Sequence, residues 1–244
     1  MRKLVVGNWK MNGKSDDLAE IVLIAAAAGR HAGVDCGLCL PATLIHRAAT
    51  ARPDFKVGGQ DCHMNSSGAH TGCVSAQMLV DAGASMTIVG HSERRAAQFE
   101  SDADVRAKAT AARQAGLNVI VCVGETLEER DAGQALDIVL GQLQGSLPDH
   151  SDGSWLSVAY EPVWAIGAGR IPENSDVAEM HGAIRKQLAE RFGEAGRSVR
   201  ILYGGSMNGD NAASLLAIPN VNGGLIGGAS LSAAKFEPIL AAAE

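Results

Sequence analysis

The sequence has no excess of basic residues. It carries 21 lysines and arginines against 27 aspartates and glutamates, a formal net charge of −6 over 244 residues. A general binder of nucleic acid presents a basic face, so we expect no nucleic-acid partner. A small anionic substrate is still compatible with this charge, because a local site can be positive on an acidic protein.

Cysteines and long apolar runs are also few. The five cysteines are an odd number and stand mostly in apolar, strand-like runs, which indicates reduced thiols rather than a disulfide framework. The first residues lack the apolar stretch of a signal peptide. The longest apolar stretch, Ile21–Ala28, is too short to cross a bilayer. We therefore expect a cytoplasmic protein with no membrane partner.

Short apolar runs alternate with segments of helical periodicity along the whole chain. The predicted strands are Leu4–Trp9, Val34–Leu40, Lys56–Gln60, Met86–Gly90, Asn118–Val123, Leu156–Glu161, Val199–Tyr203 and Val221–Ile226. The predicted helices include Leu18–Arg30, Ser75–Ala82, Ala103–Ala115 and Val177–Phe192. Eight strand–helix repeats predict an α/β fold, a (β/α)₈ barrel formed by one domain over residues 1–244. A doubly wound open sheet is the alternative, because the pattern alone does not show closure.

Two segments without a regular pattern exceed the usual loop length. They are Asp61–Gly72, after the third predicted strand, and Pro162–Asn174, after the sixth. Long loops inside a compact domain are usually functional. In a barrel both would project from the carboxyl-terminal face, where active sites are built.

The end of the first predicted strand, residues 7–15, reads GNWKMNGKS and superficially resembles a P-loop. A P-loop needs four residues between its first glycine and Gly-Lys-Ser/Thr, whereas five intervene here, so we reject that interpretation. Lys10 stands where a strand-end side chain points into a barrel mouth, and there it can act as a fixed positive charge. A solvated lysine is the alternative.

Two further candidates follow the fourth and sixth predicted strands. A helix that begins near Ser92 would place His91 at its positive end, which disfavours the imidazolium form. A neutral imidazole there can donate a hydrogen bond to a carbonyl oxygen. Glu161 ends an apolar strand before a glycine-containing loop, which suits a general base under a lid. A structural histidine and a salt-bridged glutamate are the alternatives.

Glycines follow the last two predicted strands, in the sequences YGGS at 203–206 and IGGAS at 226–230. Glycines let backbone N–H groups approach an anion closely. Barrels often bind phosphate with the loops after strands seven and eight. The two glycine clusters together therefore predict a phosphate site.

Five motifs, in order along the chain, resemble the triosephosphate isomerase family. They are NWK at 8–10, GHSERR at 90–95, VCVGETLEER at 121–130, YEPVWAIG at 160–167 and YGGS at 203–206. The resemblance implies a TIM barrel that interconverts dihydroxyacetone phosphate and glyceraldehyde 3-phosphate through an enediolate. It also implies that the enzyme needs no cofactor and serves glycolysis and gluconeogenesis.

The resemblance implies a role for each matching residue. Glu161 would be the base that moves a proton between two carbons, and His91 the neutral electrophile. Lys10 would stabilise charge and bind substrate. Asn8 would help to hold the site, with support from Ser92 and Glu93. The phosphate would be bound by Gly167, Ser206, Gly227 and Gly228.

The resemblance also implies a homodimer. The loop at Asp61–Gly72 would dock into a second copy, with Thr71 reaching the neighbouring active site and Met11 beneath the incoming loop. One departure concerns this contact: a common Gly-Glu pair reads Gly72-Cys73 here. It puts in doubt an inter-subunit salt bridge that the family usually forms to the arginine matching Arg94.

We expect no metal. Cys36 and Cys39 are three residues apart in a predicted strand, so their side chains face opposite sides and cannot share a metal or a disulfide. His63 and His70 share a loop without ligand spacing. These features disfavour a metal-dependent epimerase or aldolase-type barrel. A non-catalytic barrel is the third hypothesis, and it would be expected to have lost one of the candidate catalytic side chains.

Overall fold

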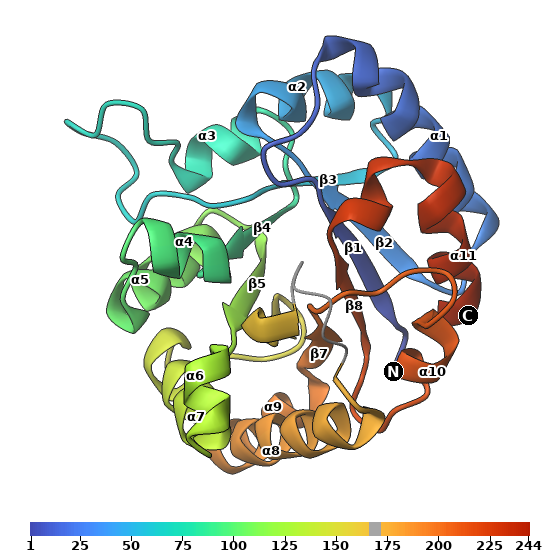
Figure 1. Cartoon of the computed structure of the whole chain (residues 1–244). Helices are drawn as coiled ribbons and strands as arrows, with labels where there is room; N and C mark the ends of the chain where they lie inside the picture. Colours follow the sequence, from blue (N-terminus) through green and yellow to red (C-terminus); the bar gives the residue numbers. More distant parts are fainter. Residues whose placement is uncertain (166–171) are drawn as a thin grey trace.

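The computed structural model describes residues 1–165 and 172–244. In these residues eight parallel strands form one closed barrel in sequence order, with the last strand paired to the first. Figure 1 shows the strands at the centre of a ring of helices. The strands are β1 (Leu4–Asn8), β2 (Asp35–Cys39), β3 (Lys56–Gly59), β4 (Met86–Val89), β5 (Asn118–Val123), β6 (Leu156–Tyr160), β7 (Arg200–Tyr203) and β8 (Gly223–Ile226). The predicted (β/α)₈ barrel is confirmed, and the open sheet is excluded.

The helices follow the strands around the outside of the barrel. They are α1 (Leu18–Arg30), α2 (Ala42–Ala51), α3 (Ala76–Asp81), α4 (Ser92–Ala97), α5 (Asp102–Gln114), α6 (Leu127–Asp131), α7 (Ala135–Ser146), α8 (Asn174–Phe192), α9 (Glu194–Ser198), α10 (Ala212–Leu216) and α11 (Ala233–Ala243). Short 3₁₀ turns lie at η1 (Ser15–Asp17), η2 (Val163–Ala165) and η3 (Gly228–Leu231). Side chains fix several helix starts: Ser101 and Thr126 each form a capping box at the beginning of α5 and α6.

The alternation of side chains along the strands creates two apolar layers. On β1, Leu4 and Val6 point into the barrel, whereas Val5 belongs to the layer between strands and helices. The inner layer contains Leu4, Val6, Cys39, Met86, Ile88, Ile120, Cys122, Ala159, Leu202 and Leu225. The interior is therefore packed, which leaves the carboxyl-terminal mouth as the place for a site.

Several predicted strands extend one residue too far at this mouth. Trp9, Gln60, Gly90 and Glu161 each lie directly after the last residue of a strand. Trp9 and Glu161 still donate their backbone N–H groups to the neighbouring strand, at 3.1 and 2.8 Å, so the strands end within one residue of the prediction. The predicted loop Pro162–Asn174 also needs correction, because η2 occupies its beginning and α8 already starts at Asn174.

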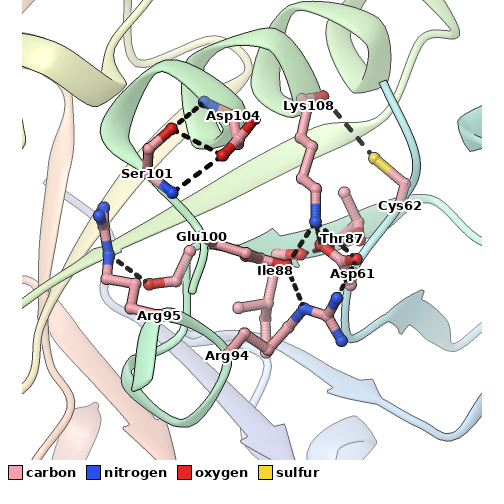
Figure 2. Close-up of polar contacts among 11 residues, drawn as sticks. Asp61, Cys62, Thr87, Ile88, Arg94, Arg95, Glu100, Ser101, Asp104 and Lys108 are labelled. Carbon is pink, nitrogen blue, oxygen red and sulfur yellow. Dashed lines mark hydrogen bonds and ion pairs between the residues drawn. The ribbon is translucent and has the colours of Figure 1, made fainter. Parts of the chain in front are cut away.

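The segment between β3 and α3 extends away from the barrel (Figure 1). An ion-pair cluster anchors its beginning, and Figure 2 shows how the side chains meet. Asp61 lies 2.9 Å from both Lys108 and Arg94, and Glu100 lies 2.5 Å from Lys108 and 2.7 Å from Arg94. The positive charges of Arg94 and Lys108 thus balance the negative charges of Asp61 and Glu100 within one chain. Such pairing offsets the cost of removing these charges from water. Burial still raises the pKa of Asp61, against the lowering effect of Lys108.

The structure places the two predicted dimer contacts on the surface. Thr71 is exposed on the loop after β3, and Met11 is 97% exposed after β1. In the described part of the chain, no helix is both long and apolar enough to span a bilayer.

Candidate active site

A cavity of about 430 Å³ opens at the carboxyl-terminal end of the barrel. Seven residues singled out from the sequence line it together: Asn8, Lys10, His91, Glu161, Ser206, Gly227 and Gly228. Residues more than 200 positions apart meet there because β1 and β8 are neighbours. The remaining phosphate-site candidate, Gly167, lies outside the described residues.

His91 and Glu161 form the centre of the site. As predicted, α4 begins at Ser92, and His91 caps it by accepting a hydrogen bond on Nδ1 from the Glu93 backbone N–H, 3.2 Å away. Nε2 of His91 lies 2.8 Å from Oε1 of Glu161. Oε2 of Glu161 accepts a hydrogen bond from the Ser92 backbone N–H at 2.9 Å. The carboxylate is thus held at the positive end of α4.

The protonation of His91 reflects opposing influences. Burial lowers the pKa of the imidazole, whereas the charge and hydrogen bond of Glu161 raise it. The net pKa lies above the ordinary value of 6.5. The neutral histidine was expected from the helix end and from the family resemblance, and the Glu161 carboxylate acts against the neutral form. With Nδ1 accepting a hydrogen bond, the neutral form of this ring carries its proton on Nε2.

Lys10 approaches the same cavity from the end of β1. Its backbone has a φ of 53°, and its N–H donates to Oδ1 of Asn8 at 3.0 Å. Its ammonium lies 2.6 Å from Oε1 of Glu93, which is itself half exposed. Glu93 also lies 3.8 Å from Nδ1 of His91, so a positive charge lies at the cavity on the side of His91.

The glycine-rich turns form the other end of the cavity. The hydroxyl of Ser206 donates to the Ala165 carbonyl at 3.2 Å, so the turn after β7 touches the segment after β6. The Gly227 carbonyl accepts hydrogen bonds from the backbone and hydroxyl of Ser230, at 2.8 and 2.7 Å. The turn after β8 is in turn joined to β1, because the Trp9 indole donates to the Ser230 carbonyl at 2.9 Å.

Gly204 provides room for the carboxylate. A Cβ atom at this position would lie 2.8 Å from Cγ of Glu161 and 3.0 Å from the Tyr160 carbonyl oxygen. Both distances are shorter than ordinary contact, so any larger residue would displace the Glu161 side chain.

Sequence reasoning gave no role to two side chains that the structure places beside these residues. Nε2 of Gln60 donates to the carbonyls of Lys10 and Cys39, at 2.9 and 3.2 Å. A polar residue at the end of a predicted strand was the signal that could have identified it. Glu125 is fully buried, and burial raises its pKa. Its place in the family motif at 121–130, two residues after the predicted strand Asn118–Val123, was the signal that could have identified it.

Glu125 supports the segment that follows Glu161. Its Oε1 accepts hydrogen bonds from the Tyr160 hydroxyl at 3.0 Å and from the Trp164 indole at 2.7 Å. Arg130 lies 3.4 Å from the same oxygen and stacks over the Trp164 ring, 4.6 Å from its centroid. The first turn after β6 is thereby fixed to the helix region after β5.

The two cysteines spaced like metal ligands do not form a metal site or a disulfide in the described structure. Cys36 and Cys39 both lie in β2, and both are free thiols. Among the residues that the structure describes, no group of three His, Cys, Asp or Glu side chains is arranged to hold a metal ion. The absence of a metal stays a prediction that an assay with a chelator tests.

A closed (β/α)₈ barrel with a carboxylate, an imidazole, a lysine and two glycine-rich turns at its mouth defines the class of barrel enzymes that act on small anionic substrates. The family model of triosephosphate isomerase matches residues 3–243. The chain therefore belongs to the triosephosphate isomerase family.

Individual relatives agree with this assignment. The chain is 56% identical to a triosephosphate isomerase of Ruegeria sp. (strain TM1040) over 241 residues, which cover 99% of this chain and 98% of the relative. It is 57% identical to that of Dinoroseobacter shibae (strain DSM 16493 / NCIMB 14021 / DFL 12), over 99% and 98% of the two chains. The crystal structure of triosephosphate isomerase from Bartonella henselae superimposes with a TM-score of 0.93 at 46% identity, covering 99% of each chain.

Proposed function

We propose that the cavity at the barrel mouth is the active site in which this enzyme interconverts dihydroxyacetone phosphate and glyceraldehyde 3-phosphate. Family membership provides the activity. The observation that carries the choice of site is the meeting of Glu161, His91 and Lys10 in one cavity of about 430 Å³.

Glu161 is the base of the proposed mechanism. The Glu161 carboxylate removes a proton from C1 of dihydroxyacetone phosphate, the electron pair forms the C1–C2 double bond, and the C2 oxygen becomes an enediolate oxygen. Nε2–H of His91 donates to the substrate oxygens, and the Lys10 ammonium stabilises the developing negative charge. His91 also moves one proton between the enediolate oxygens: Nε2–H gives its proton to the C2 oxygen, and Nε2 takes the hydroxyl proton from the C1 oxygen. Return of the proton from Glu161 to C2, with formation of the C1 carbonyl, then gives glyceraldehyde 3-phosphate, so atoms and charge balance.

The raised pKa of His91 is compatible with a neutral electrophile. Burial lowers the pKa of His91, whereas the Glu161 carboxylate and, to a lesser extent, Glu93 raise it. When Glu161 takes the substrate proton, the negative charge moves to the enediolate oxygens, which can accept the hydrogen bond that a neutral ring donates from Nε2. The Glu93 N–H on Nδ1 then keeps the remaining proton on Nε2, where it faces the substrate.

The phosphate belongs at the glycine-rich end of the cavity in this proposal. Ser206, Gly227 and Gly228 line that end, and small residues leave their backbone N–H groups accessible to an anion. Gly167 is proposed as a further donor from the lid. Asn8 and Glu93 hold Lys10 from the backbone and the ammonium sides.

The quaternary state and the cellular setting are part of the proposal. We propose a homodimer in which the loop at residues 61–72 docks into a second copy, supported by its extension from the barrel and by the exposure of Met11. We further propose one domain over residues 1–244, supported by the single barrel. Cytoplasmic location is supported by five free thiols.

A coupled assay with glyceraldehyde 3-phosphate, with and without EDTA, tests the function. We expect full isomerase turnover in both conditions. Turnover that EDTA abolishes would favour a metal-dependent epimerase or aldolase-type barrel. A folded protein without turnover would favour the non-catalytic barrel.

A further inference from the structure

The backbone of Lys10 adopts a conformation that lysine rarely takes. Its φ of 53° lies in the left-handed region, which non-glycine residues occupy only when the surroundings impose it. Lys10 follows directly after the short stretch that leaves β1, and no helix or strand of the structure includes it. The direction of its side chain therefore depends on contacts from other parts of the chain.

Two side-chain amides supply those contacts, one on each side of the residue. Oδ1 of Asn8 accepts the Lys10 N–H at 3.0 Å, and Nε2 of Gln60 donates to the Lys10 carbonyl at 2.9 Å. Among the described residues, Gln60 alone donates a hydrogen bond to that carbonyl. Its sequence distance of 50 residues makes this a tertiary contact rather than a local turn.

The same amide also reaches the second strand. Nε2 of Gln60 donates to the Cys39 carbonyl at 3.2 Å, and this carbonyl accepts the Trp9 N–H at 3.1 Å. Gln60 thus stands at the carboxyl end of β3 and ties together the ends of β1 and β2. Asn8 holds the Lys10 N–H from within the same segment, and Gln60 ties the Lys10 carbonyl to the ends of the neighbouring strands.

We propose that Gln60 is a positioning residue for Lys10: its amide holds the strained backbone that directs the Lys10 ammonium into the cavity. The inference rests on the proposed role of Lys10 in binding and charge stabilisation. Gln60 does not line the cavity and acts only through Lys10. A displacement of about 1 Å in a charge-stabilising group is enough to lower a rate substantially.

A double-mutant cycle with kcat and KM tests the proposal. Gln60→Met keeps the length of the side chain and removes both donated hydrogen bonds. We expect it to lower kcat/KM about 10-fold, which corresponds to about 1.4 kcal/mol. In a Lys10→Ala background the same change should cost less than about twofold, because there is no ammonium left to position. Equal losses in both backgrounds would overturn the inference.

Gln60→Glu provides a readout that a merely structural role would not give. An ionised carboxylate cannot donate to the two carbonyls, whereas a protonated carboxyl donates one hydrogen bond. The ratio of variant to wild-type kcat/KM should therefore rise as the pH falls through the titration of this carboxyl group. A ratio that is constant with pH, or a Gln60→Met enzyme equal to wild type, contradicts the proposal.

Controls separate this inference from the proposed function. Gln114→Met, at the exposed end of α5, should retain wild-type kinetics. Circular dichroism and thermal unfolding establish that each variant is folded. If Lys10→Ala were as active as wild type, the role of Lys10 and this inference would both be wrong. If Lys10→Ala is impaired and the cycle is additive, only the role of Gln60 is wrong.

Discussion

Nε2 of His91 and Oε1 of Glu161 lie 2.8 Å apart, so the proposed electrophile and the proposed base are in direct contact. The second oxygen of the carboxylate accepts the Ser92 N–H. A substrate that contacts both side chains has to break the contact between the His91 imidazole and the Glu161 carboxylate, and it must replace that contact for each group. Substrate binding should therefore change the pKa of His91.

Glu161→Gln should lower kcat severely while leaving a phosphate-bearing mimic of the enediolate bound. A general base contributes roughly 10²–10⁴-fold, and loss of the one proposed base should reach the upper end or beyond. Steady-state kinetics measures the first effect and competitive inhibition the second. Wild-type kcat in this variant would mean that another group is the base.

The same substitution should lower the pKa of His91, because it removes the carboxylate that raises it. NMR titration of the imidazole in wild type and Glu161→Gln measures this shift. The folded-state pKa of His91 is above 6.5, so its pairing stabilises the fold fully below pH 6.5. That contribution is lost as the pH rises through the raised pKa. An unchanged titration in the variant would contradict the assigned cause.

His181 should make the fold sensitive to acid. It is fully buried in α8, donates from Nδ1 to the Asn220 carbonyl at 3.1 Å, and burial lowers its pKa from 6.5 to about 4. The unfolded chain takes up this proton first, so stability is lost as the pH falls from about 6.5 to about 4. The shift corresponds to about 3 kcal/mol.

Urea unfolding of His181→Gln between pH 4 and 8 tests this effect. Glutamine can still donate to the carbonyl but does not titrate, so the variant should lose less stability in acid than wild type. His46→Gln, at an exposed position of α2, is the control and should retain the wild-type slope. Identical slopes for His181→Gln and wild type would exclude His181 as the source.

Phe99→Gly should stabilise the chain. Phe99 follows the end of α4 with a φ of 55° and is 87% exposed. The left-handed conformation costs a non-glycine residue about 1–2 kcal/mol, and glycine avoids this cost. Glycine offsets part of the gain, because its backbone loses more conformational entropy on folding. We expect a net gain of about 1 kcal/mol in chemical unfolding. Phe99→Ala keeps the backbone cost, so an equal gain there would implicate the ring instead.

Light scattering after size exclusion should show a dimer at micromolar concentration. Arg94 already pairs with Asp61 and Glu100 of its own chain, so its charge is compensated before any partner arrives. Association should therefore depend mainly on apolar and backbone contacts, with little weakening by salt. A fully active monomer would contradict the proposed docking of the loop after β3.

The barrel could be predicted because the alternation of a short apolar run with a helical segment repeats eight times along the chain. Each strand is a short apolar run, and several runs end in or are directly followed by a polar or glycine residue at the same rim, as at Asn8, Gly90 and Glu161. Strand ends were less accurate, as at Trp9 and Glu161, because pairing with the neighbouring strand rather than local propensity ends each strand. The residues that line the cavity were found because the strand-end rule and the family motifs agree on them.

What remained unpredicted depends on contacts between distant residues. The hydrogen bond from Gln60 to Lys10 spans 50 positions, and that from Ser92 to Glu161 spans 69. The helix end near His91 was correctly located, yet its effect on the imidazole could not be weighed without the carboxylate. The pairing of Arg94 with Asp61 has the same origin. A local sequence pattern does not show which distant residues form these hydrogen bonds and ion pairs.

The barrel closes through its first and last strands, with Leu4 of β1 beside Gly223 of β8. A chain synthesised only as far as residue 222 leaves the facing edges of β1 and β7 without a neighbour, and such edges recruit other chains. Lys10 emerges from the ribosome early, whereas Gly227 and Gly228 emerge late. Catalytic competence and resistance to edge-to-edge aggregation therefore arise in the same step, after the last strand has been released.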